Sequence, residues 1–412
     1  MVHAALCGEW SEEVRLGRGM NMIEKMKMQI KMVIGCLMKI LLLPFRFCKV
    51  RDNRIIFNSL TGGNYIEYTC NPKYIYECLQ RKDEDKYEII WAFAHPEKYK
   101  FLEQQGVQLV KHFTWQTFYY LMTSKVVVTS GSYVPWISFR PNQTVIHTWH
   151  GGGAYKRLDN GSEDIKKMVK RRNAIAGSHV TLFVTSSKEF TRYVIRGAFA
   201  YQGEILQVGM PRNDFLVRGE TGFAERKVRE YYGIEEGTRI LLYAPTYREN
   251  GTYERLNLQK VLKHLEQSKK EKWVCLERSH RYEAEEQFAI DDKTGEIKIA
   301  SDYQEMQELL AASDVLITDY SSSIWDYSFL NRPCFLYVPD LVEYRRKRGF
   351  YVDIDEWQIP YAQNEKELLR QLEQIWKINW KERMETHHRK LGCQETGQAA
   401  ECVVKYIEKI CM

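Results

Sequence analysis

The chain has 412 residues, 44% of them hydrophobic, which suits two or three domains with buried cores. Its formal net charge of +6 is modest for this length, so it permits contact with phosphates or an anionic membrane and gives no reason to expect nucleic acid. The ten cysteines form no C-x-x-C pair and no Cys/His ligand spacing, which argues against a disulfide scaffold or a zinc site and for reduced thiols.

The N-terminal 50 residues form a leader with its own character. Residues 1–19 lack the order of a secretory signal, and Met20 and Met22 are plausible alternative starts. Between residues 23 and 48, apolar side chains recur at helical spacing: Ile30, Val33, Ile34, Leu37, Met38 and Leu41. Basic side chains interrupt or follow them: Lys27, Lys31, Lys39 and Arg46.

The apolar run Ile40–Leu43 within this leader is too short for a membrane span, which needs about 20 apolar residues. The pattern therefore predicts a basic amphipathic helix that lies on an anionic membrane surface. Docking of the same helix on the protein's own core is the alternative.

The remaining chain alternates between strand and helix patterns, which predicts an α/β fold with wound parallel sheets. Residues 51–204 form the first expected domain, with strands at Arg54–Phe57, Tyr87–Phe93, Val107–Val110, Lys125–Thr129, Val145–Thr148 and Leu182–Thr185, and helices at Pro72–Gln80 and Thr114–Met122. Residues 205–412 form the second, with strands at Ile205–Val208, Arg239–Tyr243, Trp273–Glu277, Ile297–Ala300, Val315–Thr318 and Cys334–Tyr337.

A hinge is expected around Gly209–Pro211, between the two predicted domains. Two Rossmann-like domains facing one another would enclose a cleft, and ligands bind at the carboxyl ends of strands in such sheets. The absence of a G-x-G-x-x-G segment argues against a dinucleotide cofactor.

Four expected strand ends carry side chains suited to phosphate chemistry. His150 follows Val145–Thr148 and precedes glycines that let a ligand approach the backbone, which suits a general base. Arg248 follows Arg239–Tyr243 and can clamp a phosphate, while His280 follows Trp273–Glu277 and can donate to a phosphoryl oxygen. The turn Ser321–Ser323 can cap a helix or hold an anion. Each of these features taken alone can also be a helix cap, a salt bridge or a structural histidine. Their joint occurrence at strand ends favours a phosphate-binding site.

Three further motifs have competing explanations. His150-Gly-Gly-Gly153 resembles the oxyanion loop of esterases, but the chain has no G-x-S-x-G nucleophile elbow. Asp353-Ile-Asp355 resembles a metal motif, but carboxylate pairs more often face solvent, so no metal is expected. The run Lys166–Arg172 is either a solvated helix face or a contact for anionic lipid or polymer.

Seven ordered segments together resemble the CDP-glycerol glycerophosphotransferases, the family of teichoic acid primases and polymerases. The resemblance covers about residues 52–355. Its segments are Asn71–Tyr76, Trp149–Gly151 with Lys156, Val208–Asp214, Tyr243–Arg248, Arg278–His280, Ile317–Ser322 with Asp326, and Tyr344–Gly349.

The resemblance implies a GT-B fold and a peripheral enzyme on the cytoplasmic face of the cell membrane. The implied donor is a CDP-activated polyol phosphate, CDP-glycerol or CDP-ribitol, with no cofactor, and the acceptor is a hydroxyl of a membrane lipid or growing polymer. Catalytic roles are implied for His150 and His280. The other expected substrate-binding residues are Gly151, Lys156, Arg212, Asn213, Thr246, Arg248, Thr318, Asp319, Ser321, Ser322 and Asp326.

The chain departs from the family pattern at two places near the expected phosphates. Gly152-Gly153-Ala154 stand where the family usually has Thr or a similar residue followed by Pro, and Arg281 stands where Pro is common. Three alternatives to glycerol phosphate transfer therefore stay open: ribitol phosphate transfer, a GT-B glycosyltransferase that uses a nucleotide sugar, and a membrane-associated protein that binds without turnover.

Overall fold

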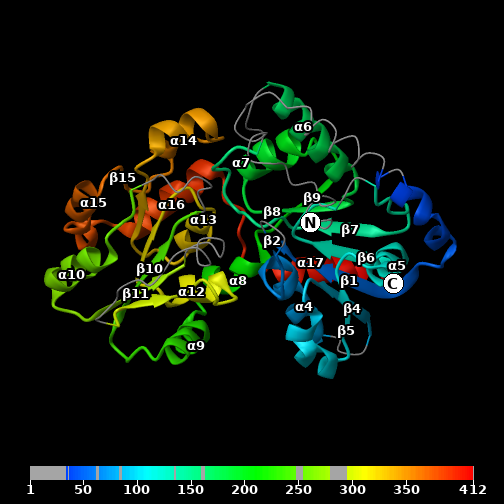
Figure 1. Ribbon diagram of the computed structural model, residues 1–412, viewed down its shortest axis with the longest axis horizontal. Helices are drawn as coiled ribbons and strands as arrows, with labels where there is room; N and C mark the ends of the chain where they lie inside the picture. The colour runs from blue at the N-terminus through cyan, green and yellow to red at the C-terminus, as the bar shows by residue number, and fades with distance from the viewer. Residues whose placement is uncertain are drawn as a thin grey trace. The chain divides into compact units, whose positions relative to one another are not determined.

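The computed structural model describes residues 34–35, 37–61, 65–82, 86–133, 136–158, 163–246, 254–278 and 295–411. Contacts divide the chain into two compact units (Figure 1). Unit 1 comprises the described parts of Met1–His150, Leu158–Asp214 and Gln394–Met412. Unit 2 comprises those of Gly151–Arg157 and Phe215–Cys393.

Unit 1 is built on a parallel sheet whose described strands run in the order β5-β4-β1-β6-β7-β8-β9. These strands are β1 (Arg51–Asn58), β4 (Glu88–Phe93), β5 (Gln108–Lys111), β6 (Ser124–Thr129), β7 (Thr144–His147), β8 (Leu182–Thr185) and β9 (Glu204–Gln207). A short antiparallel pair, β2 (Leu60–Thr61) and β3 (Tyr65–Ile66), follows β1. The helices are η1 (Leu43–Phe47), α4 (Cys70–Lys82), η2 (Pro96–Gln105), α5 (Trp115–Thr123), α6 (Glu163–Ser178), α7 (Lys188–Phe190), the π-helix η3 (Thr191–Ala198), η4 (Pro211–Asn213) and α17 (Ala399–Ile410).

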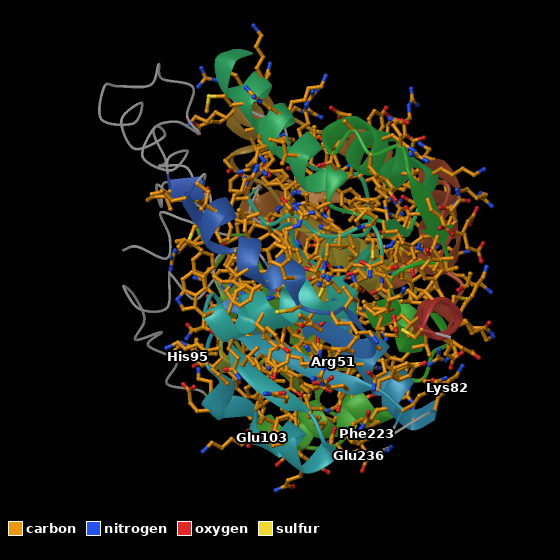
Figure 2. The ribbon with its side chains drawn as sticks, turned by 90° about the vertical axis from the view of Figure 1, so that its right-hand side faces the viewer. Arg51, Lys82, His95, Glu103, Phe223 and Glu236 are labelled. Carbon is orange, nitrogen blue, oxygen red and sulfur yellow. The ribbon has the colours of Figure 1, made fainter. Side chains whose placement is uncertain are left out.

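Alternate residues of β1 point into two different cores, as the two-residue period of a strand requires. Ile55 and Phe57 pack with side chains of α4 and α17. Ile56 packs on the opposite face with Phe118 of α5. At the rim of the first face, Lys82 lies at the end of α4 (Figure 2). It pairs with Glu401 of α17 at 3.6 Å. Burial on both faces explains why the inner strands of this sheet are mostly apolar, whereas the edge strands β5 and β9 carry polar side chains.

The sequence places β9 in the second domain, but β9 pairs with β8 at the edge of the first sheet. Unit 1 then continues to Asp214, beyond the hinge expected at Gly209–Pro211. The buried carboxylate of Asp214 accepts the backbone N–H groups of Ala399 and Ala400 at 2.8 Å each, so it ties this segment to the start of α17. The predicted boundary at residue 204 and the assignment of residues 394–412 to the second domain are corrected accordingly.

Unit 2 contains a second parallel sheet, with described strands in the order β12-β11-β10-β13-β14-β15. These are β10 (Arg239–Ala244), β11 (Trp273–Glu277), β12 (Ile297–Ile299), β13 (Val315–Thr318), β14 (Cys334–Tyr337) and β15 (Tyr361–Ala362). Its helices are α9 (Gly222–Tyr232), α10 (Leu258–Lys269), α12 (Met306–Ala312), α13 (Ser323–Ser328), α14 (Leu341–Lys347), η5 (Ile354–Glu356), α15 (Glu365–Leu372), η6 (Ile375–Lys377) and α16 (Trp380–Leu391). The short helix α8 (Asp214–Val217) begins at the last residue of unit 1.

The predicted α/β class and both parallel sheets are confirmed. Every strand named from the sequence overlaps an observed strand, and β1 differs most, since it begins at Arg51 and not at Arg54. The predicted cleft between two domains stays a prediction. Of the predicted membrane helix, residues 34–35 and 37–41 are helical, whereas residues 1–33 and Cys36 lie outside the described residues. Within the described part of the chain, no helix is long and apolar enough to cross a membrane.

Candidate active site

The candidate base His150 lies in unit 1, in the turn that follows β7. Its ring Nδ1 lies 3.1 Å from the backbone oxygen of Ser130. Because a carbonyl oxygen can only accept, this hydrogen bond places the ring proton on Nδ1. The neutral imidazole then carries its lone pair on Nε2, which is the state a general base needs.

The residue before the candidate base is strained. Trp149 has φ +54°, in the left-handed region that bulky side chains avoid. Such a conformation costs on the order of 1–3 kcal/mol and persists only where surrounding contacts hold it. The Trp149 N–H donates to Nδ1 of His147 at 3.1 Å, and burial lowers the pKa of His147 to about 3, so that acceptor stays neutral at physiological pH.

Arg212 and Asn213 are buried in unit 1 and contact the protein itself. Arg212 Nη1 donates to the backbone oxygen of His150 at 2.8 Å, and Asn213 Nδ2 donates to Glu395 at 3.2 Å. The sequence predicts both as substrate-binding residues. In the structure, the side chain of Arg212 binds the main chain of His150.

In unit 2, the predicted residues at the ends of β10 and β13 form one cluster. The backbone N–H and the hydroxyl of Thr246 both donate to Oδ2 of Asp319, at 2.9 and 2.8 Å. The hydroxyl of Thr318 donates to the backbone oxygen of Ala244 at 2.6 Å. Thr318 and Asp319 are buried, so these contacts hold the two strand ends together at the carboxyl edge of the sheet.

The serine turn leads from β13 into α13. Ser321 Oγ accepts from the backbone N–H and the hydroxyl of Ser323, at 3.3 and 2.9 Å. Ser321 and Ser322 are partly exposed, and no side-chain hydrogen bond caps the helix at Ser322. Asp326, one turn further on, is buried and accepts from Gln307 at 3.1 Å. The turn therefore caps itself through Ser321, and its first two hydroxyls remain partly exposed at the start of α13.

The segment that follows the candidate base, Gly151–Arg157, packs with unit 2. A Cβ on Gly152 would lie 1.8 Å from Cδ1 of the fully buried Trp325, far closer than atoms can approach. Lys156 forms a β-bridge with Phe350. Because Trp325 belongs to α13, Gly152 contacts the helix that starts at the serine turn. Gly152, one of the residues at which this chain departs from the family pattern, therefore leaves room for the indole ring of Trp325.

Tyr155 anchors the same segment in the core of unit 2. Its hydroxyl lies 2.7 Å from Nε2 of His387, and both side chains are buried. Burial lowers the pKa of His387 to about 3 and raises the pKa of Tyr155 well above its usual value. Both groups are consequently neutral near pH 7, as a hydrogen-bonded pair in an apolar core should be.

The other predicted residues fall into two groups. Arg248 and His280 lie outside the described residues. Asp353 and Asp355 both bind Arg345, at 2.7 and 2.8 Å, so this D-x-D pair is accounted for by ion pairs. The basic run Lys166–Arg172 lies on α6.

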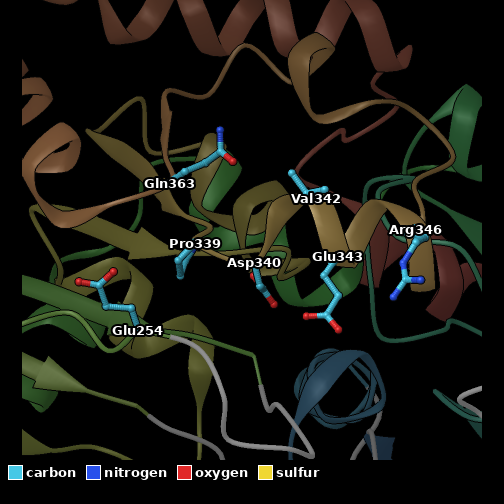
Figure 3. A pocket seen from close by; sticks show the side chains of 7 residues that line it. All are labelled: Glu254, Pro339, Asp340, Val342, Glu343, Arg346 and Gln363. Carbon is cyan, nitrogen blue, oxygen red and sulfur yellow. The ribbon is translucent and has the colours of Figure 1, made fainter.

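A pocket of about 550 Å³ opens in unit 2 beyond the ends of β14 and β15 (Figure 3). It is lined by Glu254, Pro339, Asp340, Val342, Glu343, Arg346 and Gln363. The hydroxyl of Tyr320, next to the serine turn, donates to Oδ1 of Asp340 at 3.0 Å. Three carboxylates in the lining suit hydroxyl groups better than a polyphosphate.

Sequence reasoning missed the residues that hold the site in place: His147, Trp325 and His387. All three are buried. Trp325 and His387 act through contacts with Gly152 and Tyr155, which are distant in sequence, so local spacing gives no signal for them. His147 is only two residues from Trp149, but its contact depends on the left-handed backbone of the turn, which the sequence does not show. Asn71 stood in a recognised segment, but its buried contacts with the His150 turn could not be inferred from the sequence.

Comparisons with known proteins agree with the resemblance. The family model described as CDP-Glycerol:Poly(glycerophosphate) glycerophosphotransferase matches residues 41–409. A teichoic acid poly(glycerol phosphate) polymerase of Bacillus spizizenii is 31% identical over 316 residues, which cover 74% of this chain and 79% of that protein. A teichoic acid glycerol-phosphate transferase of Staphylococcus aureus is 28% identical over 374 residues, 87% of this chain and 93% of that protein.

Other relatives are longer than this chain or share mainly its fold. The chain spans about half, 52%, of a poly(glycerol phosphate) polymerase of Bacillus subtilis, at 27% identity over 93% of its own length. A solved structure of a variant of the wall teichoic acid polymerase TagF has a TM-score of 0.77 at 24% identity and covers 95% of this chain and 98% of that chain. That similarity supports the α/β fold with two parallel sheets.

Proposed function

Because the chain belongs to the CDP-glycerol:poly(glycerophosphate) glycerophosphotransferase family, we propose that it transfers glycerol phosphate from CDP-glycerol to a hydroxyl of a membrane-bound lipid or polymer, in teichoic-acid-like polymer synthesis. The GT-B arrangement, with a cleft between the two units, is part of this proposal. The observation that carries the proposal is the tautomer of His150, whose Nδ1–H donates to the backbone oxygen of Ser130, so that the lone pair of the neutral ring is on Nε2.

In the proposed reaction, the acceptor oxygen attacks the β-phosphorus of CDP-glycerol. The acceptor O–H loses its proton to Nε2 of His150, a new P–O bond forms, and the pyrophosphate bond breaks so that CMP leaves. In unit 2, the hydroxyls of Ser321 and Ser322, with Arg248 and His280, bind the pyrophosphate. Positioning and charge stabilisation supply most of the rate, as in other phosphoryl transfers.

The test of this function measures CMP release by the purified protein with CDP-glycerol and a lipid-linked acceptor. CDP-ribitol is the second donor in the assay, since a ribitol-phosphate polymerase of Bacillus spizizenii is also similar, at 26% identity. His150→Ala should lower kcat by about 10²-fold or more, because a general base contributes about 10²–10⁴-fold. If the protein binds a donor but releases CMP from neither, it is a binding protein without turnover. If uridine nucleotides compete with the donor for the site, it is an enzyme that uses a nucleotide sugar.

We further propose that unit 1 binds the cytoplasmic face of the membrane through an apolar patch at its N-terminal side. Exposed apolar side chains gather in the described residues before β1 and on α5: Leu37, Ile40, Leu41, Leu43, Phe47 and Trp115. Phe47 is 91% exposed and Ile40 61%. Phe45 joins the two parts of the patch, since its ring centroid lies 6.3 Å from that of Trp115. Exposed Lys39, Arg46 and Lys49 would face anionic lipid.

Co-sedimentation with anionic and zwitterionic vesicles tests this surface. Phe47→Glu should weaken binding about 10-fold or more, because burial of one such side chain contributes about 1.5–3 kcal/mol. Phe223→Glu is the matched control, since Phe223 is a 70% exposed phenylalanine of unit 2. Added salt should weaken binding to anionic vesicles. If Phe47→Glu binds as the parent protein does, the membrane contact lies elsewhere, and Lys166–Arg172 is the next candidate.

A further inference from the structure

The turn that carries His150 has an unfavourable backbone conformation with a bulky residue at its centre. Trp149 has φ +54°, and its indole ring stacks on the imidazole of His150 with the centroids 4.3 Å apart. A left-handed tryptophan is not stable in isolation, so other parts of unit 1 must hold it. The position of the candidate base depends on those contacts.

Three residues bind the backbone of this turn from outside it or from the strand before it. His147 Nδ1 accepts the Trp149 N–H at 3.1 Å. Asn71 Nδ2 donates to the Trp149 oxygen at 2.9 Å and lies 3.4 Å from that of Thr148. Arg212 Nη1 donates to the His150 oxygen at 2.8 Å. Together with the Ser130 oxygen on the ring, these contacts fix both the main chain and the imidazole of His150.

Two of these residues also bind each other. The backbone N–H of Arg212 donates to Oδ1 of Asn71 at 3.1 Å. This contact orients the Asn71 amide, because its oxygen faces an N–H donor and its NH₂ group must then face the carbonyl oxygens of the turn. Asn71 is 0% exposed and Arg212 is 5% exposed. The pair is therefore an internal support in unit 1, placed against the backbone of His150.

We propose that Asn71 and Arg212 are positioning residues that hold the strained Trp149–His150 turn and thereby aim His150 for proton transfer. The proposal rests on the proposed function, because it assigns His150 as the base. It also reassigns Arg212, which sequence reasoning placed among the substrate-binding residues. Neither residue needs to touch the donor, since each acts through the peptide groups on either side of the base.

Near-isosteric substitutions test the proposal. Asn71→Asp keeps the shape but replaces the NH₂ donor with a carboxylate oxygen that faces carbonyl oxygens, and Arg212→Lys keeps the charge but loses the guanidinium fork. Each should lower kcat about 10- to 100-fold, because a misplacement of about 1 Å at a catalytic group can cost about 10²-fold. Donor affinity by calorimetry should stay within about twofold, since uniform binding is untouched. Arg192→Lys is the control, because Arg192 is a 70% exposed arginine of unit 1.

A double-mutant cycle separates positioning from donor binding. In a His150→Ala background the residues have no base to aim, so Arg212→Lys and Asn71→Asp should cause no further loss of the residual rate. A donor-binding role for Arg212 would instead weaken donor affinity in both backgrounds and add to the loss. That result, or unchanged turnover in both single variants, overturns the proposal.

A spectroscopic measurement keeps this test separate from that of the function itself. Histidine labelled with ¹⁵N reports which ring nitrogen carries the proton, and His150→Ala identifies the signal. In the parent protein His150 should show the Nδ1–H tautomer, and Asn71→Asp should shift or broaden that signal while Arg192→Lys leaves it in place. An unshifted His150 signal in Asn71→Asp overturns the positioning role, even if no donor is turned over. Absence of CMP release by the parent protein, with the expected shift present, overturns only the proposed function.

Discussion

Replacing Gly152 by alanine tests whether the loop after the candidate base is fitted to one indole ring. The added Cβ would lie 1.8 Å from Cδ1 of Trp325, whereas carbon atoms in contact are about 3.5–4.0 Å apart. The ring or the loop must therefore move by about 1.7–2.2 Å. The ring has little freedom, because Trp325 is 0% exposed and its centroid lies 5.4 Å from that of Phe329 and 5.6 Å from that of His388.

Overpacking of this kind destabilises a core by about 1–3 kcal/mol. For a unit of this size, each 1 kcal/mol lowers Tm by about 2–4 °C. Gly152→Ala should therefore lower the thermal transition of unit 2, measured by calorimetry. Gly222→Ala is the matched control, because the nearest atom to its Cβ would be the end of the Arg226 side chain at 3.7 Å.

A second substitution shows whether Trp325 is the cause. Trp325→Leu should destabilise unit 2 on its own by about 2–4 kcal/mol, because it leaves a cavity. In that background, Gly152→Ala should cost little, which gives a coupling energy of at least about 1 kcal/mol. The same Tm loss for Gly152→Ala with and without the indole would refute the reasoning and place the strain in the backbone of the loop.

Three further predictions concern stability. Burial lowers the pKa of His147 and His387 to about 3 and that of His388 to about 4, so the unfolded chain binds more protons than the folded chain between about pH 4 and 6.5. The free energy of unfolding from urea titrations should therefore fall as pH drops through this window, by up to about 1.4 kcal/mol per pH unit for each histidine, and His387→Gln should flatten the fall. Trp149→Gly should be more stable than Trp149→Ala by about 1 kcal/mol in urea titrations, since both lose the ring but only glycine accepts φ +54° without strain. Asp214→Ala should destabilise unit 1 by about 1–3 kcal/mol, because two buried N–H groups at the start of α17 lose their acceptor, and the opposite sign or no change in Tm would contradict that role.

The strands could be predicted because parallel strands buried on both faces are short apolar runs between turn residues. Such a run does not show which neighbouring strand it will pair with. The pattern at Ile205–Val208 fits a strand of either sheet, and it is the pairing of β9 with β8 that decides the matter. The apolar face of α17 likewise fits either core, and the contacts of Val403 and Ile407 with unit 1 could not be inferred from spacing.

The candidate site was predictable to a similar extent. Thr246 and Asp319 meet at the carboxyl edge of their sheet, as expected for residues that follow neighbouring parallel strands, whereas Arg248 and His280 lie outside the described residues. That these residues bind a substrate stays a prediction. The function of an individual polar residue was harder to infer. Arg212 has the chemistry of a phosphate ligand, but its burial and its contact with the His150 oxygen appear only in the folded chain.

The chain passes from unit 1 to unit 2 directly after His150, so the contacts of Arg212 and of Trp325 act on consecutive segments. The candidate base belongs to unit 1 and the next residue, Gly151, to unit 2. Unit 1 fixes the backbone on one side through Arg212, and unit 2 fixes the loop on the other side through Trp325. A single peptide bond therefore joins two independently held segments. If each support acts only on its own side, any loss of turnover in Gly152→Ala should multiply with the loss in Arg212→Lys. If the peptide bond passes a displacement from one side to the other, the double variant should lose less than the product of the two single losses.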